Sequence, residues 1–240
     1  MEKLRAEKSF ILPILVGIGH FVWLYLLCSA LYNNNLLIGI DSVTVDNIII
    51  KFADDYLLML LFPTIIIIFN RKNLNDFNLN CNSKRMVIIL VVLLIVFFFL
   101  HNDYSVAGFY KFFFYLIVIS FGEEFIYRGY IYNILKEKSV IKAIIISGTL
   151  WGIGHGILPS ILENSNIFLE MLYNIGGGII GGWYFIYIQE KSGTLWVPVL
   201  IHALLDYSYM RFGFLIAIIV LVYYIRLSKE NKSKTIANYR

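Results

Sequence analysis

Charge is the property this sequence has least of. Only 15% of its 240 residues are Asp, Glu, Lys or Arg, whereas soluble domains carry about 25%. Hydrophobic residues make up 59% of the chain and aromatic residues 17%, and the mean hydropathy is +0.74. This composition argues against an ordinary soluble domain, and the long apolar runs predict a polytopic α-helical membrane protein.

Several motifs are also missing. The chain has two cysteines, Cys28 in an apolar run and Cys81 in a predicted cytoplasmic loop, so neither a disulfide nor a thiolate zinc site is expected. HExxH does not occur. The net charge of +4 comes from basic residues between apolar runs, where they set topology, so no nucleic-acid partner is predicted. The first apolar run is too long for a signal peptide and is expected to remain as a span.

Eight apolar segments are long enough, or nearly so, to cross a bilayer. They predict an all-α bundle of about eight transmembrane helices, because the strands of a membrane barrel would alternate polar and apolar residues. We expect one transmembrane domain over 1–226, with a motif-bearing core at about 107–210, and a polar cytoplasmic tail over 227–240. The segments are 10–32, 56–69, 86–100, 107–135, 140–158, 167–188, 194–210 and 212–225.

The basic residues predict the orientation of this bundle. With the N-terminus in the cytoplasm, 16 of the 20 Lys and Arg residues fall on the cytoplasmic side. The outer side receives only Lys51, Lys111 and Arg211, together with an acid-rich loop over 41–55. Such a bias follows the positive-inside rule and predicts that both termini are cytoplasmic. The expected location is a bacterial cytoplasmic membrane, with the lipid bilayer as a constant partner.

Glycines recur in the sixth segment at helical spacing. Gly177 and Gly181 form one small-xxx-small pair, and Gly178 and Gly182 form another. This pattern favours close packing against another helix over a ligand-binding loop.

Three charged residues lie inside the fourth segment, namely Glu123, Glu124 and Arg128. Each costs roughly 2.5–3.5 kcal/mol at the centre of a membrane helix, so they must face protein or water. Glu124 and Arg128 are four residues apart and are expected to pair, which leaves Glu123 about 100° around the helix. Charges at this depth favour a functional site over a network that only fixes helix packing.

Imidazoles occur in two further segments. The fifth carries His155 after a glycine-rich turn, and the seventh carries His202 and Asp206, which share a helix face. Such a His–Asp pair can serve as a proton relay, as half of a metal site or as an oriented hydrogen-bond donor. His20, near the start of the first segment, is expected to be structural.

These three pieces together resemble the CPBP family (also called Abi) of CAAX proteases and bacteriocin-processing enzymes. The family pattern is EExxxR, then FxxxH, then HxxxN or HxxxD, on separate helices. Here it reads Glu123-Glu124-Phe-Ile-Tyr-Arg128, Trp151-Gly-Ile-Gly-His155 and His202-Ala-Leu-Leu-Asp206, within roughly 113–207. Trp151 replaces the usual Phe, and Asp206 replaces the commoner Asn, which bears on the oxyanion role because an ionised Asp cannot donate a hydrogen bond.

The resemblance implies an intramembrane glutamic endopeptidase that needs no cofactor. Glu123, helped by His155, would activate water, while His202 and Asp206 would stabilise the oxyanion. Asp206 has a second possible role, to orient His202 and keep it protonated. The resemblance makes Glu124, Arg128 and Trp151 supporting residues.

Other readings of the same residues stay open. A zinc protease would use Glu123, His155 and His202 as ligands, although the absent HExxH leaves no two histidines pre-arranged on one helix. A serine protease would have to use Ser147, but the residues around Ser147 do not form a nucleophile motif. A bacteriocin-immunity or membrane-regulatory partner protein is the non-enzymatic alternative. A proton-coupled transporter is a further one, but no inverted repeat supports it.

The expected substrate is a peptide or a membrane protein, with a bacteriocin or pheromone favoured over a CAAX protein. The predicted topology places Glu123 and His202 near mid-membrane and His155 nearer the outer face. A CAAX-like enzyme would instead need a cytoplasmic opening. The sequence does not predict an oligomeric state.

Overall fold

A computed structural model describes residues 10–80 and 82–238, and these ranges contain helices and connecting loops without a strand. Predictions that concern residues 1–9, Cys81 and residues 239–240 lie outside this description, including those for Lys3, Arg5, Lys8 and Arg240. Cys28 is a free, buried thiol. The described part therefore confirms an all-α chain.

The helices follow the predicted segments, with some changed boundaries. Two of them are composite, because π-helical stretches interrupt regular α-helix. In the first, Ile48–Asp55 (α2) continues through the π-helical stretch Tyr56–Leu60 into Leu61–Phe69 (α3). In the second, Val106–Phe113 (α5), Gly122–Glu124 (α6) and Asn133–Leu135 (α7) are joined by the π-helical stretches Phe114–Phe121 and Phe125–Tyr132. The others are Ile11–Asn33 (α1), Lys84–His101 (α4), Val140–His155 (α8), Ile157–Leu162 (α9), Ile167–Ser192 (α10), Trp196–Asp206 (α11) and Phe212–Asn238 (α12). Short 3-10 turns cover Ile40–Ser42 and Leu74–Phe77.

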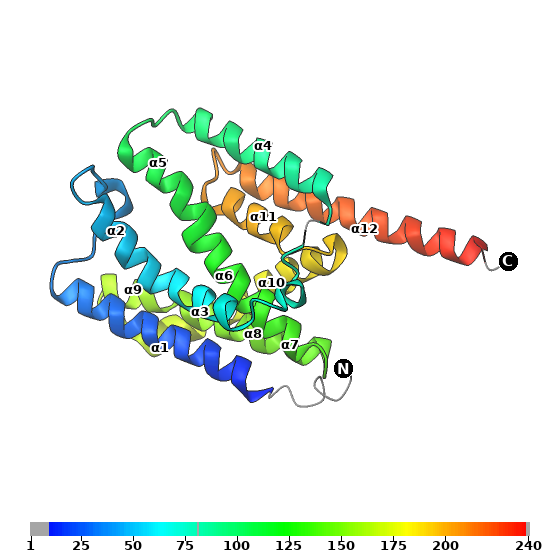
Figure 1. The fold of residues 1–240 in the computed structure, drawn as a ribbon, viewed down its shortest axis with the longest axis horizontal. Coiled ribbons are helices and arrows are strands. Elements are labelled where there is room, and N and C mark those ends of the chain that lie inside the picture. The colour runs from blue at the N-terminus through cyan, green and yellow to red at the C-terminus, as the bar shows by residue number, and fades with distance from the viewer. Residues whose placement is uncertain (1–9, 81, 239–240) are drawn as a thin grey trace.

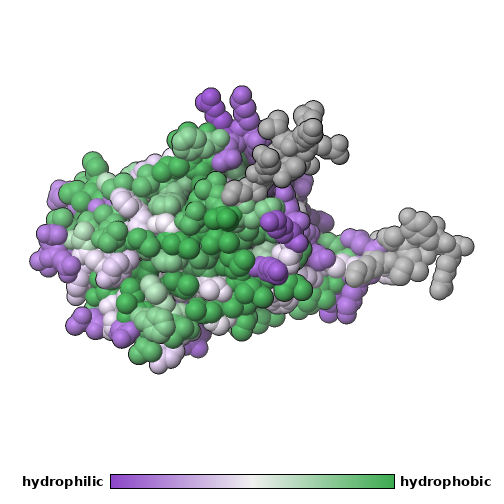
Figure 2. Space-filling model, turned by 90° about the horizontal axis from the view of Figure 1, so that it is seen from below, coloured by the Kyte–Doolittle hydropathy of each residue, from purple (hydrophilic) through white to green (hydrophobic). Residues whose placement is uncertain are grey.

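Six helices of the described chain are long and apolar enough to cross a membrane. They are Ile11–Asn33, Ile48–Phe69, Lys84–His101, Val106–Leu135, Val140–Leu162 and Phe212–Asn231. Figure 2 shows a broad apolar band between hydrophilic side chains gathered towards the two ends of the face in view. Side chains that face lipid need no polar partner, so this band fits a multi-pass integral membrane protein.

The second span starts earlier than the sequence predicts. We expected it to begin at residue 56 and placed Lys51 in an outer loop, together with Asp54 and Asp55, but all three lie within α2. Lys51 and Asp55 are four residues apart and form a buried ion pair, with Nζ and Oδ1 2.6 Å apart. The prediction was wrong because paired charges on one helix face cost far less than the same charges counted separately.

The last helix also extends further than the apolar pattern. We separated a polar tail at residue 227, whereas α12 continues without a break to Asn238. The polar segment is thus helical over its described part, and it prolongs the helix beyond the span.

Two helices approach each other closely where glycines meet. A Cβ added to Gly178 on α10 would lie 2.5 Å from the Gly148 carbonyl oxygen of α8, and one added to Gly182 would lie 3.0 Å from Gly148 Cα. In contrast, a Cβ on Gly177 would meet nothing within 4 Å. The predicted packing face is therefore the Gly178/Gly182 pair, and it holds α8 against α10.

The bundle has two ends of opposite charge. In Figure 1 the α1–α2 and α4–α5 loops lie at the left, and the α7–α8 turn lies at the right. We call the left end, with the α1–α2, α4–α5 and α9–α10 loops, the acidic end; its loops carry Asp41, Asp46, Asp103 and Glu163. We call the right end, with the α3–α4, α7–α8 and α10–α11 connections, the basic end; it carries Arg71, Lys72, Lys84, Arg85, Lys136, Lys138, Lys142 and Lys191.

Candidate active site

The composite helix 106–135 carries the three charged residues predicted from the fourth segment. Glu124 and Arg128 are both fully buried and form an ion pair, with 3.3 Å between Glu124 Oε1 and Arg128 Nη1. The guanidinium lies between aromatic rings, with its Cζ 4.1 Å from the Trp151 ring centroid and 5.2 Å from that of Phe185. The predicted pair is confirmed. The cation–π contacts stabilise the buried guanidinium charge in place of part of the water that would surround it at the protein surface.

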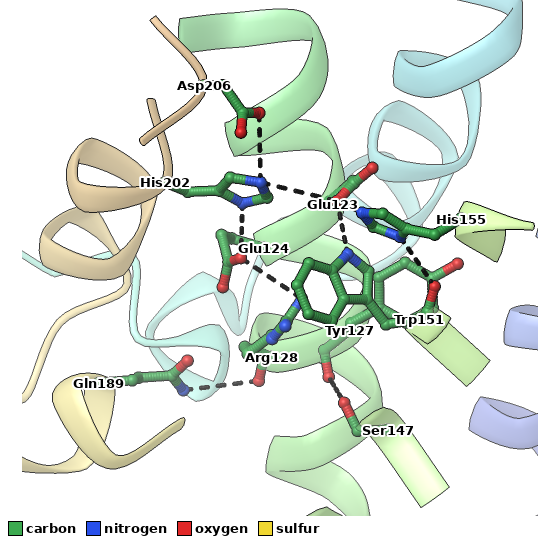
Figure 3. Close-up of polar contacts among 10 residues, drawn as sticks. All are labelled: Glu123, Glu124, Tyr127, Arg128, Ser147, Trp151, His155, Gln189, His202 and Asp206. Atoms are coloured by element: carbon green, nitrogen blue, oxygen red, sulfur yellow. Dashed lines mark hydrogen bonds and ion pairs between the residues drawn. The ribbon is translucent and has the colours of Figure 1, made fainter. Parts of the chain in front are cut away.

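His202 of α11 connects this pair to the rest of the cluster (Figure 3). Its Nδ1 lies 2.8 Å from Glu124 Oε1, and its Nε2 lies 3.4 Å from Asp206 Oδ2. The ring also stacks on Phe185 at a centroid distance of 5.0 Å. The predicted contact between His202 and Asp206 is confirmed. The bond to Glu124 was not predicted, since the two residues are 78 positions apart and no local spacing signals it.

Trp151 makes a contact that the Phe usual at this position could not make. Its indole Nε1–H donates to Glu123 Oε2 at 2.5 Å, whereas a Phe at this position would have no donor. Trp151 thus lies between the Arg128 guanidinium on its ring face and the Glu123 carboxylate on its edge. It joins the buried ion pair to the remaining carboxylate of the cluster.

His155 is oriented by its own helix. Its Nδ1 lies 3.0 Å from the Trp151 carbonyl oxygen, and because a carbonyl only accepts, Nδ1 carries the proton. A neutral His155 therefore presents the lone pair of Nε2, which lies 4.0 Å from Glu123 Oε2. On the other side of Glu123, His202 Nε2 lies 3.9 Å from the same oxygen. Glu123 thus has an imidazole on either side, although the sequence suggested no cation near it.

The cluster borders a cavity of about 1100 Å³, slightly larger than most small-molecule sites. Glu123, Tyr127, Trp151 and His155 contribute to its wall, whereas His202 and Asp206 do not. The His155 side chain is 41% exposed and that of Glu123 is 13% exposed. A ligand in this cavity can therefore reach Glu123 and His155 directly.

Two further residues of the wall were not assigned a role from the sequence. His20, expected to be structural, is buried and lines the same cavity, with its Nδ1 3.1 Å from the Tyr127 hydroxyl. Tyr127 lies four residues after Glu123, so the helical spacing was a signal we did not use. Ser147, the candidate of the serine protease reading, is fully buried and donates to the Tyr127 carbonyl at 2.7 Å.

The donor set was also tested as a metal site. Over the described ranges, no group of three His, Cys, Asp or Glu side chains is arranged to hold a metal ion. The Glu123 oxygen that faces both imidazoles already accepts the indole hydrogen bond. As they are arranged here, these three side chains do not form a ready-made zinc site, and the chelator experiment below tests the zinc reading.

Comparison with protein families identifies a relationship over the part of the chain that carries the motifs. Residues 105–208 match the family described as "Type II CAAX prenyl endopeptidase Rce1-like". The match contains all three motifs and confirms the resemblance to CAAX-type proteases inferred from them. No curated protein and no solved structure matches the chain.

Proposed function

We propose that this chain, an integral membrane protein whose residues 105–208 match the Rce1-like family, is an intramembrane endopeptidase with a glutamate base. The family match supports a CAAX-protease-like hydrolase, and the assignment of roles is ours. The observation that carries it is the position of Glu123 Oε2, which lies on a cavity wall with His155 Nε2 4.0 Å and His202 Nε2 3.9 Å away. The substrate is a peptide or membrane-protein segment within a bacterial cytoplasmic membrane.

Glu123 and His155 activate the water in this proposal. A carboxylate oxygen and an imidazole lone pair 4.0 Å apart suit a water molecule that donates one hydrogen to each. As the water oxygen attacks the peptide carbonyl carbon, one proton passes to Glu123. The C–N bond then breaks, and that proton is returned to the departing amine, so that the products are one carboxylic acid and one amine.

His202 stabilises the oxyanion. Both of its ring nitrogens face carboxylate oxygens, from Glu124 and from Asp206, which suits a doubly protonated ring that donates on both sides. As the oxyanion forms on the carbonyl oxygen of the substrate, the Nε2–H, which lies 3.9 Å from Glu123 Oε2 and has only the 3.4 Å contact with Asp206, turns to donate to that oxygen. Asp206 accepts from His202, which favours the orienting role over direct donation to the oxyanion.

The first experiment compares wild type with Glu123→Ala and Glu123→Gln for cleavage of a quenched peptide library in detergent, with and without a zinc chelator. We expect chelator-resistant cleavage that falls by about 10²–10⁴-fold in both variants, because general base catalysis contributes that much. Glu163→Gln, at an exposed carboxylate outside the cluster, is the matched control and should cleave like wild type.

Each other result has a definite meaning. Cleavage that survives Glu123→Ala would refute the glutamate base, and chelator-sensitive cleavage would return the site to zinc. If all forms elute as folded protein and none cleaves the library, the non-enzymatic reading as an immunity or regulatory protein is favoured instead.

A further inference from the structure

The cavity at the candidate site lies in one half of the bundle. Its lining includes the exposed residues Asn33, Asn35 and Asp41, at the end of α1 and in the loop that follows, which we call the rim, together with Glu123 and Trp151. Among the described residues that line it, none comes from the loops of the basic end. The cavity therefore runs from the cluster towards the acidic end.

The basic end is closed beneath the cluster. Phe77, in the short turn before α4, is buried and packs edge-on against Phe125 at 5.5 Å. On the same side, Phe121 stacks on Trp196 at 5.7 Å, and Leu195 is fully buried. Phe77, Phe125 and Leu195 belong to one hydrophobic core, and Phe121 and Trp196 pack against it.

Hydrogen bonds attach that loop to the α10–α11 turn. Leu195 N donates to the Asn78 carbonyl at 2.8 Å, and the Thr194 hydroxyl donates to the Asn80 carbonyl at 2.8 Å. The Ser83 hydroxyl donates to the Ser192 carbonyl at 2.7 Å. Bonds between two segments more than a hundred residues apart thus hold these two connections of the basic end together.

The charges indicate which end faces which side of the membrane. The connections of the basic end and the helix ends next to them carry the eight Lys and Arg residues named above. Of the three cations on the opposite side, Lys51 is paired with Asp55 and Lys111 with Asp41, and the third is Arg211 in the turn between α11 and α12. By the positive-inside rule, the basic end is cytoplasmic and the acidic end faces outwards.

From the closed basic end and the open acidic end together, we infer that the site is reached from the extracytoplasmic face and takes a peptide segment presented there. That the peptide is cleaved rests on the proposed function, whereas the direction in which the cavity opens does not depend on it. The inference runs against the cytoplasmic opening that a CAAX-like enzyme would need. It selects exported peptides, or the outer segments of membrane proteins, as the substrate class.

Thiol labelling tests the direction of opening without a known substrate. In a background of Cys28→Ala and Cys81→Ser, one variant carries Asn33→Cys at the cavity rim and its matched control carries Asn75→Cys at the basic end; both asparagines are exposed. Each is expressed in bacterial cells and treated with a membrane-impermeant maleimide, in right-side-out and in inside-out vesicles. We expect the rim thiol to react at least tenfold faster in right-side-out vesicles, and the control thiol to show the reverse.

A rim thiol that reacts faster in inside-out vesicles would overturn the inference, since the cavity would then open to the cytoplasm. Equal reaction of both thiols in both preparations would overturn the fixed topology on which it depends. Because the variants sit at exposed positions, folding is checked by comparing their elution in detergent with that of wild type.

Cleavage gives the second test. The rim thiol, once modified with a bulky maleimide, should lower library cleavage in detergent at least tenfold, whereas the modified control thiol should leave it unchanged. Full cleavage by the blocked rim variant would refute entry at this end. If the unmodified protein cleaves nothing, the proposed function fails, while the labelling result still decides the direction of opening.

Discussion

Two buried ion pairs in this protein share one spacing but differ in their surroundings. Glu124–Arg128 and Lys51–Asp55 are both four residues apart, and both border or lie within a π-helical stretch. The first is wholly enclosed between α8, α10 and α11. The second lines the outer part of the cavity, where the Tyr110 hydroxyl donates to Asp55 Oδ2 at 2.7 Å.

The difference shows what the spacing alone decides. An i, i+4 pair lets a charged residue enter a membrane helix at low cost, and this applies to both pairs. What surrounds the pair decides its further role: Glu124 holds His202 and Arg128 supports Trp151, so the inner pair shapes the cluster around Glu123. The outer pair, in contrast, bonds within itself and to Tyr110 rather than to a residue of that cluster. We therefore expect the inner pair to matter for chemistry and the outer pair for the cavity wall.

The largest expected effect is on stability, and it separates the two pairs. Glu124→Gln leaves the Arg128 charge without its carboxylate at a fully buried position, which costs about 3–5 kcal/mol for a broken buried pair. Asp55→Asn should cost clearly less, because Lys51 borders a cavity open to solvent and the amide oxygen still accepts from Tyr110. Unfolding of both variants by denaturing detergent measures this, and equal losses would remove the distinction.

The same two variants also separate the pairs by catalysis. Glu124→Gln should lower kcat by about 100-fold in the fraction that is folded, since a misplaced His202 no longer faces the reacting carbonyl. Asp55→Asn should change KM more than kcat, because Asp55 lies on the cavity wall away from Glu123. Library cleavage at several peptide concentrations gives both constants. A larger fall in kcat for Asp55→Asn would mean that the outer pair takes part in the chemistry.

Much of the inner region could be predicted from the sequence, and the reason is physical. Charges in the middle of an apolar run are conspicuous because the bilayer makes them costly, so Glu123, Glu124 and Arg128 identify the helix, and helical spacing identifies the Glu124–Arg128 pair. The same reasoning missed Lys51–Asp55, because these charges lie at the end of an apolar run and resemble a loop.

Contacts between helices could not be predicted from one sequence. The Trp151 indole bond to Glu123, the Glu124–His202 bond and the His20–Tyr127 contact each join residues on different helices. Their formation depends on how α1, α8 and α11 pack around the helix 106–135, and no local spacing encodes that packing. The sequence left the side of access open for the same reason, since it depends on how the helices and loops pack around the cavity.

Trp151→Phe sharpens the comparison by cutting the link between the inner pair and Glu123. Phe keeps a ring over Arg128 and removes only the N–H that bonds Glu123 Oε2. A hydrogen bond to a charged group contributes about 1.5–3 kcal/mol to stability, so the free energy of unfolding should fall by up to that amount. Because Glu123 also loses the contact that fixes its position, kcat should fall at least tenfold while KM changes little. An unchanged kcat would show that Glu123 needs no support from Trp151, and Trp183→Phe, at an exposed indole, is the matched control.

Asp206→Asn is expected to have the smallest effect, because this contact is the most open of the cluster. The Asp206 side chain is 33% exposed and its Oδ2 lies 3.4 Å from His202 Nε2, and partly exposed pairs contribute about 0.2–1 kcal/mol. We therefore expect kcat to fall about two- to fivefold, with the larger part of His202 orientation left to Glu124. Full activity in Asp206→Asn would mean that Glu124 alone orients the ring. A fall in kcat as large as that of Glu124→Gln would mean instead that Glu124 and Asp206 contribute equally to the orientation of His202. The burial of Glu124 would then no longer explain why the inner pair controls the site.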